Sequence, residues 1–157
     1  MSGTKIRVRK ATTLLREDHR KVKKLFAEFE ELEAGDVNEK GELFELIRQE
    51  LTLHAQIEEE LFYPALQQID DEEVKELVLE AHEEHKIVKT LIAELMEMTP
   101  EDESFDAKMK VLIESVKHHA EEEEQDLFPS FEKLPRGTQD QISDQLRARK
   151  EELKGGE

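Results

Sequence analysis

The stretch HAQIEEELFYP, residues 54–64, returns later in the chain as HAEEEEQDLFP, residues 119–129. Both copies read H-A-x-x-E-E, and in both a proline stands ten residues after the histidine. In an α-helix, residues four apart lie one turn apart on the same face, so the histidine and the first glutamate of each copy share a face. The apolar residues around them predict that this face points into a helical core.

Four long segments carry apolar residues at three- and four-residue spacing, which is typical of amphipathic helices. They cover about residues 12–34, 38–68, 72–98 and 100–129, and the few glycines and prolines lie near their ends. We expect Pro64 to kink or end the second segment. Thr99 and Pro100 predict the start of the fourth, as an N-cap followed by proline at the first helical position.

Segments of this length with short connections predict an all-α fold, an antiparallel up-and-down four-helix bundle with a short additional C-terminal helix. We expect the bundle to occupy residues 12–134 and the C-terminal helical tail residues 135–157. The chain of 157 residues is the size of one domain.

The amino-acid composition limits the classes of molecule that the chain is expected to bind. The formal net charge of −17 predicts no binding to nucleic acid, since a phosphate backbone needs a basic surface. The chain has no cysteine, so a thiolate metal site is excluded. No apolar run approaches the roughly 20 residues that span a bilayer, and no signal-peptide pattern is visible. A soluble, cytoplasmic protein without a membrane partner is therefore expected.

Each of the four segments places one histidine on its apolar face: His19, His54, His85 and His119. Two of these segments add a carboxylate one turn later, at Glu58 and at Glu123. Burying so many ionisable groups costs several kcal/mol for each uncompensated charge. Either each histidine hydrogen-bonds its glutamate, or a metal ion compensates the carboxylates; four inward histidines favour the metal.

The types of ligand limit which metal ions the site could bind. Imidazole and carboxylate without thiolate suit iron, manganese or zinc. Because the two glutamates lie on separate helices, each one turn from a histidine, they can bridge a pair of ions. A binuclear centre is therefore expected.

The order of these motifs resembles that of the hemerythrin-like, or HHE cation-binding, domain. The matching elements are Asp18-His19, His54-x-x-x-Glu58, Glu84-His85 and His119-x-x-x-Glu123 followed by Leu-Phe-Pro. The resemblance implies a non-haem di-iron centre in which Glu58 and Glu123 bridge two iron ions together with an oxo or hydroxo group. It also implies that the four histidines are terminal ligands, and that one iron keeps an open position for dioxygen, peroxide or nitric oxide.

One position departs from the family pattern. Oxygen-carrying hemerythrins have a second histidine four residues before the one on the third helix, and this chain has Ala81 there. His82, Tyr63, Glu59 or water could take that place, and His82 could equally be a partly exposed side chain. The departure favours a reactive centre over a reversible oxygen carrier.

The expected function is the binding of a small oxidant at the open iron position, with possible peroxide reduction. The alternative is an oxygen, iron or redox sensor, or an iron-binding interaction module, without turnover. A bundle of hydrogen-bonded His/Glu pairs without metal is a third interpretation. No catalytic acid or base can be assigned from the sequence. The physiological ligand, the redox partner and the oligomeric state stay open at this level.

Overall fold

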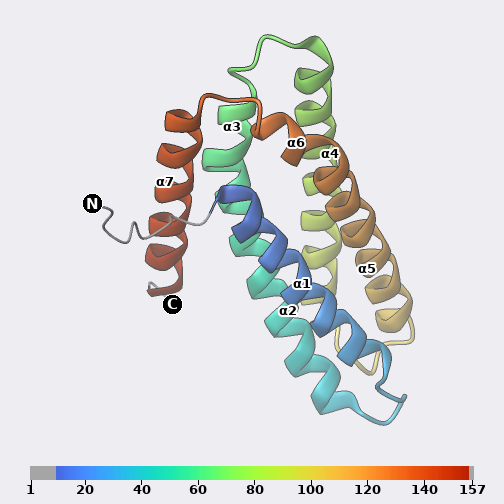
Figure 1. Ribbon diagram of the computed structural model, residues 1–157. Helices are drawn as coiled ribbons and strands as arrows, with labels where there is room; N and C mark the ends of the chain where they lie inside the picture. Colours follow the sequence, from blue (N-terminus) through green and yellow to red (C-terminus); the bar gives the residue numbers. More distant parts are fainter. Residues whose placement is uncertain (1–9, 156–157) are drawn as a thin grey trace.

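The computed structural model describes residues 10–155, and within that range it contains helices and no strand. Four helices form the bundle: α1 (Ala11–Glu30), α2 (Val37–Ile57), α4 (Glu72–Met96) and α5 (Phe105–Glu122). Each runs antiparallel to the one before it along the chain (Figure 1). The predicted all-α, up-and-down four-helix bundle is confirmed.

Two of the four helices change type at the repeated stretch. Helix α2 continues into the π-helix η1 (Glu58–Phe62) and the short helix α3 (Tyr63–Leu66). Helix α5 continues in the same way into η2 (Glu123–Leu127) and α6 (Phe128–Phe131). Each bridging-glutamate candidate is therefore the first residue of a π-helix. Such wide turns inside helices are frequent at functional sites.

The repeated prolines give a physical reason for these wide turns. A proline has no N–H to donate, and its ring clashes with the carbonyl of residue i−4, so a regular α turn is disfavoured before it. The chain adopts i→i+5 bonding here instead: the N–H of Tyr63 donates to the carbonyl of Glu58, and that of Phe128 to the carbonyl of Glu123. Pro64 thus marks a change of helix type, and helical structure continues to Leu66.

The predicted start of the fourth helix at Pro100 is wrong. Helix α5 begins at Phe105, after a turn formed by residues 99–104. The Asp102 carboxylate accepts the N–H of Thr99 at 2.8 Å, while the N–H of Asp102 donates to the carbonyl of Thr99 at 2.9 Å. This pair of bonds closes a turn where the proline signal predicted a helix.

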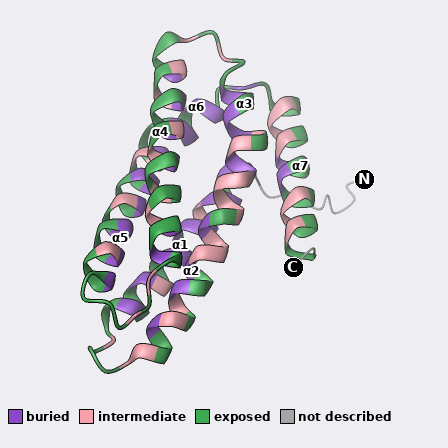
Figure 2. Ribbon diagram, turned by 180° about the vertical axis from the view of Figure 1, so that it is seen from behind, coloured by how far each residue is buried: buried purple, intermediate pink, exposed green. Residues whose placement is uncertain are grey.

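The apolar core is divided into two clusters. One contains Leu15, Phe62, Phe128 and Phe131, and the other contains Phe26, Ile47, Leu95 and Met109; these eight side chains are almost completely buried. Buried residues of all four helices face inward along the bundle (Figure 2). The four inward histidines and Glu123 lie in the sequence between members of the two clusters. The bundle therefore has a polar layer across an otherwise apolar interior.

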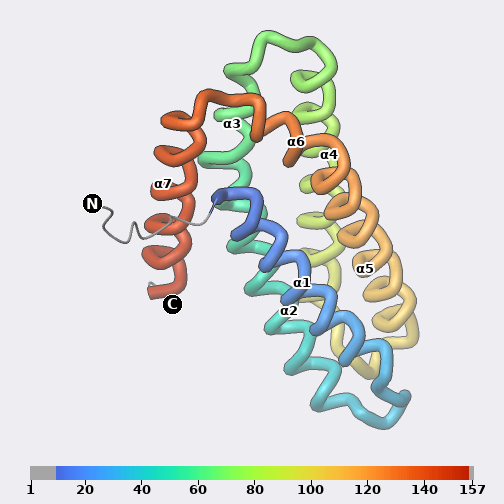
Figure 3. The backbone as a smooth tube through the Cα atoms, viewed as in Figure 1, coloured from blue at the N-terminus to red at the C-terminus, as the bar shows by residue number. Residues whose placement is uncertain are grey.

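A fifth long helix, α7 (Arg136–Gly155), lies outside the bundle and contacts α1, α2 and η1 (Figure 3). With 20 residues it is as long as α1, so it is longer than the short helix expected. Leu146 anchors it in the core, and the hydroxyl of Ser143 accepts the N–H of Ala11 at 2.7 Å. No helix within residues 10–155 has the length and apolar character needed to cross a bilayer.

Candidate metal centre

The polar layer is built by one histidine from each bundle helix and one glutamate from each π-helix. His19, His85, Glu58 and Glu123 are buried, each less than 6% exposed, and His119 is 8% exposed. The side chain of His54 is 12% exposed. The structure thus brings together all six residues that the sequence singled out as principal ligands.

Glu58 directs its two carboxylate oxygens to two different histidines. Its Oε1 lies 3.1 Å from Nε2 of His85, and its Oε2 lies 3.3 Å from Nε2 of His54. These histidines come from α4 and α2, on either side of the carboxylate. A glutamate in this position can bridge two ions.

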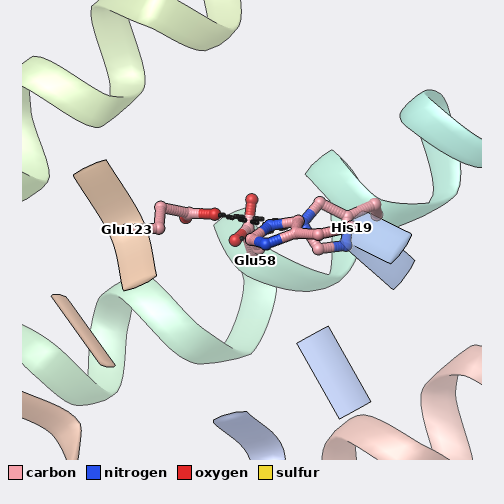
Figure 4. Close-up of side chains that lie close together, drawn as sticks. His19, Glu58 and Glu123 are labelled. Carbon is pink, nitrogen blue, oxygen red and sulfur yellow. Dashed lines mark hydrogen bonds and ion pairs between the residues drawn. The ribbon is translucent and has the colours of Figure 1, made fainter. Parts of the chain in front are cut away.

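Glu123 has the same arrangement toward the other two helices. Its Oε1 lies 3.1 Å from Nε2 of His19, and its Oε2 lies 3.5 Å from Nε2 of His119. The Glu123 side chain extends toward Glu58 and His19 from the opposite side of the bundle (Figure 4). The two glutamates therefore face each other across the layer with the imidazoles around them.

Two overlapping groups of donor atoms result. His19, His54, Glu58 and Glu123 form one, and Glu58, His85 and His119 form the other, with the donor atoms of each group within 4.8 Å of one another. Ligands about 2 Å from a common ion lie up to about 4 Å apart, so small side-chain shifts suffice for coordination. A shared carboxylate and two groups fit a binuclear centre.

In each of the four imidazoles, Nδ1 is hydrogen-bonded to a carboxylate that comes from a different helix. Asp18 bonds Nδ1 of His54 at 2.9 Å, and Glu84 bonds Nδ1 of His119 at 2.6 Å. The other two contacts are Glu59 to His85 and Glu124 to His19, both 2.7 Å. A carboxylate on Nδ1 fixes the ring and leaves Nε2 to face a metal, as in carboxylate–histidine–metal arrangements.

Two buried atoms in the layer support a metal directly. Nε2 of His54 and Oε2 of Glu58 have no hydrogen-bond partner among the described residues, although they lie 3.3 Å apart. Buried polar atoms without a partner are costly and rare in folded proteins. A cation between them would satisfy both, and so the donor set fits a bound metal ion.

Without metal, the layer is held by charge pairing. Burial on its own lowers the pKa of His54, but the Glu58 carboxylate and the hydrogen bond to Asp18 raise it well above its usual range. Burial likewise raises the pKa of Glu123, yet its bond to Glu58 and the nearby His119 bring it well below its usual range. Protons thus occupy the place of the cations, and metal binding must release them.

The side chain of Tyr63 reaches the second group of donor atoms. Its hydroxyl donates to Oε2 of Glu123 at 2.6 Å and lies 3.1 Å from Nε2 of His85 and 3.2 Å from Nε2 of His119. Burial, Glu58 and Glu123 raise the pKa of Tyr63 well above its usual range. Of the substitutes considered for the missing histidine, Tyr63 is the one whose polar atom reaches this group.

The other candidates lie further out. His82 is only half-buried and belongs to neither donor group, and its ring packs edge-on against the ring of Tyr63 with centroids 5.1 Å apart. Glu59 supports His85 from behind, as described above, and also pairs with Lys89 at 2.8 Å. The structure therefore places His82 beside the site.

Sequence reasoning missed the residues that connect the site to α7. Lys150 donates to Oδ1 of Asp18, whose Oδ2 bonds His54. Arg149 pairs with Glu60 of η1 at 2.8 Å. The signal available was a basic pair, Arg149-Lys150, on a polar helix next to a strongly acidic bundle. The charge of this pair does not by itself predict which carboxylates the two side chains contact.

Comparison with known proteins agrees with the helical-bundle fold and with a cation-binding site. Residues 10–131 match the family described as "Hemerythrin HHE cation binding domain", and the chain belongs to this family. A crystal structure of a hemerythrin HHE cation binding domain-containing protein from Mycobacterium kansasii is 26% identical and superposes with a TM-score of 0.80. It covers 94% of this chain and 89% of the other, so the match includes part of α7.

Two curated proteins are also similar. A protein named "DNA nickase" from Nostoc sp. is 30% identical over 119 residues, which are 75% of this chain and 32% of that protein. A hemerythrin-like protein of Schizosaccharomyces pombe is 33% identical over 84 residues, 54% of this chain and 41% of that protein. The chain thus spans less than half the length of either relative. The expected cytoplasmic location and lack of nucleic-acid binding stay predictions.

Proposed function

We propose that this chain is a non-haem di-iron protein that binds a small oxidant, namely dioxygen, peroxide or nitric oxide, and that it can reduce peroxide. The orientation of the four imidazoles carries the proposal: carboxylates occupy every Nδ1, so every Nε2 faces the two buried glutamates. Imidazole and carboxylate donors of this kind suit iron, and the family resemblance favours iron over manganese or zinc.

In the proposed centre, Glu58 and Glu123 would each contact both ions, because each directs its oxygens to histidines of different helices. His19 and His54 would hold one ion, and His85 and His119 would hold the other. His82 is not assigned to the ligand set, since its ring packs against Tyr63 and it belongs to neither group of donor atoms.

Two iron ions can supply a bound oxidant with two electrons, one from each ion. The chain's own contribution is to hold protons and orient groups. The raised pKa of Tyr63, caused by burial and the two glutamates, keeps its hydroxyl protonated. That hydroxyl lies 3.1 Å from Nε2 of His85 and 3.2 Å from Nε2 of His119. It can therefore donate a hydrogen bond to a small ligand at this end of the site.

Anaerobic loading with ferrous iron, followed by metal analysis and an optical spectrum, tests the proposal. We expect two irons per chain and the appearance of ferric charge-transfer bands when peroxide or oxygen is added. Glu58→Gln and Glu123→Gln should each lose at least one iron. Glu60→Gln is the matched control, because Glu60 is exposed and lies on the same π-helix. A wild-type protein that stays free of metal would refute the proposal.

A sensor without turnover is the alternative, and the contact between α7 and the site favours it. Asp18 lies between His54 and Lys150, so a shift of His54 on metal binding is passed to α7. Such a protein would change the docking of α7 between its metal-free and metal-loaded states. Limited proteolysis of both states measures this directly, whereas repeated consumption of peroxide by the iron-loaded protein with an added reductant would decide for an enzyme.

A further inference from the structure

A cavity of about 430 Å³ opens beside the candidate centre, between α2 and α4, and reaches α1 and α5. His54, His85 and His119 lie in its wall. A water molecule occupies about 30 Å³ of liquid, so the cavity has room for roughly 14 waters. Dioxygen and hydrogen peroxide have two heavy atoms each. The cavity falls instead in the range of about 300–1,000 Å³ that is usual for organic ligands.

Much of the wall away from the histidines is apolar. Leu51, Ile92, Val116 and Ala120 line it and are each at most 8% exposed, and Val88 lies on the same face of α4 as Ile92. Polar groups converge at the histidine end. This division fits a molecule with an apolar body and a single polar end directed at the centre.

The charges around the cavity favour a neutral ligand over an anionic one. Apart from the histidines, Lys89 is the only cationic side chain among the described residues that line it, and its ammonium is already paired with Glu59 at 2.8 Å. The remaining charged lining residues, Asp18, Glu50 and Glu60, are acidic and are themselves paired with Lys150, Lys21 and Arg149. The described lining residues therefore offer a carboxylate or phosphate no unpaired lysine or arginine, and a neutral occupant is favoured, because burying an unpaired charge is costly.

We propose that this cavity binds a neutral organic hydroperoxide, R–O–O–H. The group R packs against Leu51, Ile92 and Val116, and the peroxide end points toward the histidines. The inference rests on the proposed function and names its substrate class. It explains why a site that could serve a two-atom oxidant has an apolar space many times larger beside it.

The chemistry balances with the electrons of the proposed centre. The O–O bond breaks, the substrate takes up two electrons and two protons, and the products are the alcohol R–O–H and one water. The electrons come from two ferrous ions that both become ferric, and the protons come from solvent. One loading with ferrous iron therefore supports one turnover.

Binding is tested with 2-phenyl-2-propanol, the unreactive alcohol product of cumene hydroperoxide, by calorimetry on metal-free and zinc-loaded protein. We expect saturable binding that Ala55→Phe weakens at least about tenfold, because Ala55 lines the cavity. Val88→Phe, from the opposite helix, should do the same and replaces Ala55→Phe if that variant does not fold. The matched control is Ala93→Phe, whose exposed site on α4 is outside the cavity.

Reactivity is tested with the ferrous-loaded protein in single turnover. The ratio of the rate with cumene hydroperoxide to the rate with hydrogen peroxide should fall about tenfold in Ala55→Phe and stay unchanged in Ala93→Phe. Absence of alcohol binding in a protein that takes up iron and reacts with hydrogen peroxide overturns this inference alone. Failure to bind iron overturns the proposed function, and the calorimetry then still decides whether the cavity takes an apolar organic molecule.

Discussion

The hydroxyl of Tyr63 donates a hydrogen bond of 2.6 Å to Oε2 of Glu123, a residue 60 positions later in the chain. The same oxygen of Glu123 lies 3.5 Å from His119. Tyr63 therefore shares an acceptor with one of the proposed ligands, and its hydroxyl also lies 3.1 Å from Nε2 of His85. Its role can be tested separately from that of the six principal residues.

Replacing Tyr63 with phenylalanine keeps the ring in the core and removes only the hydroxyl. We expect the metal affinity to fall about tenfold, because groups that orient metal ligands typically contribute 10–100-fold. Competition with a chelator measures the metal affinities of the two proteins. Equal affinities in the two proteins would show that the hydroxyl has no part in metal binding.

Lys150→Met removes the ammonium that holds Asp18 and so loosens the support of His54. Burial raises the pKa of Asp18, but its bonds to His54 and Lys150 bring it down to about 2, which shows that the carboxylate depends on both partners. A partly buried pair of this kind contributes about 1 kcal/mol, which corresponds to a fall of about 2–4 °C in melting temperature.

The same variant should also bind iron a few times more weakly, because the Nδ1 contact that orients His54 becomes less rigid. Lys154→Met is the control, since Lys154 is exposed and lies one turn further along α7. Thermal melts of the metal-free proteins measure the change in melting temperature, and chelator competition measures the change in iron affinity. Identical losses in both variants would point to a general effect of charge on α7.

The stability of the metal-free protein should decrease as the pH rises from 7 to 10. Burial on its own lowers the pKa of His119, but Glu123, Glu84 and Glu58 raise it to about 10. A histidine whose pKa is raised in the folded state stabilises the protein fully below its unfolded value of about 6.5, and this contribution is lost as the pH passes through about 10.

We expect the melting temperature to fall by about 2–4 °C or more over this range, equivalent to about 1 kcal/mol. His119→Gln should reduce the dependence, while His118→Gln should not, because His118 is exposed on the neighbouring face. Metal affinity should change in the opposite direction and increase with pH, since binding displaces protons from the imidazoles. A melting temperature independent of pH would contradict the charge pairing described for the metal-free site.

Pro64→Ala tests whether the prolines determine the wide turns that begin at the two glutamates proposed as bridging ligands. Alanine restores an N–H that can bond the carbonyl of Glu60 in a regular α turn, which then competes with the π turn. The displacement of Glu58 should lower metal affinity about tenfold without loss of helix content by circular dichroism. Pro129→Ala should act in the same way through Glu123. Pro100→Ala, in the turn before α5, should leave the affinity unchanged.

Much of the candidate site could be predicted from local spacing. The four-residue interval in each copy of the repeat places His54 with Glu58, and His119 with Glu123, on one helical face whatever the rest of the chain does. The apolar periodicity then directs these faces inward and predicts a bundle. The start of α5 was predicted wrongly because the side chain of Asp102 closes a turn that competes with the proline signal.

The contacts between helices could not be predicted from the spacing of residues along the sequence. Asp18 stands next to His19 in the sequence but holds His54, and Glu84 stands next to His85 but holds His119. Each carboxylate supports the histidine of another helix, because adjacent residues on a helix point about 100° apart. Which partner each one meets depends on how the helices are rotated and shifted along one another.

The sequence by itself determined the helices, the inward faces and the six principal donor residues, because these follow from intervals within single helices. The tertiary structure decided that the hydroxyl of Tyr63 reaches His85 and His119, and that Lys150 of α7 supports His54 through Asp18. It also decided that a large apolar cavity opens beside the histidines. These features depend on the packing of side chains from several helices, and no local pattern in the amino-acid sequence predicts that packing.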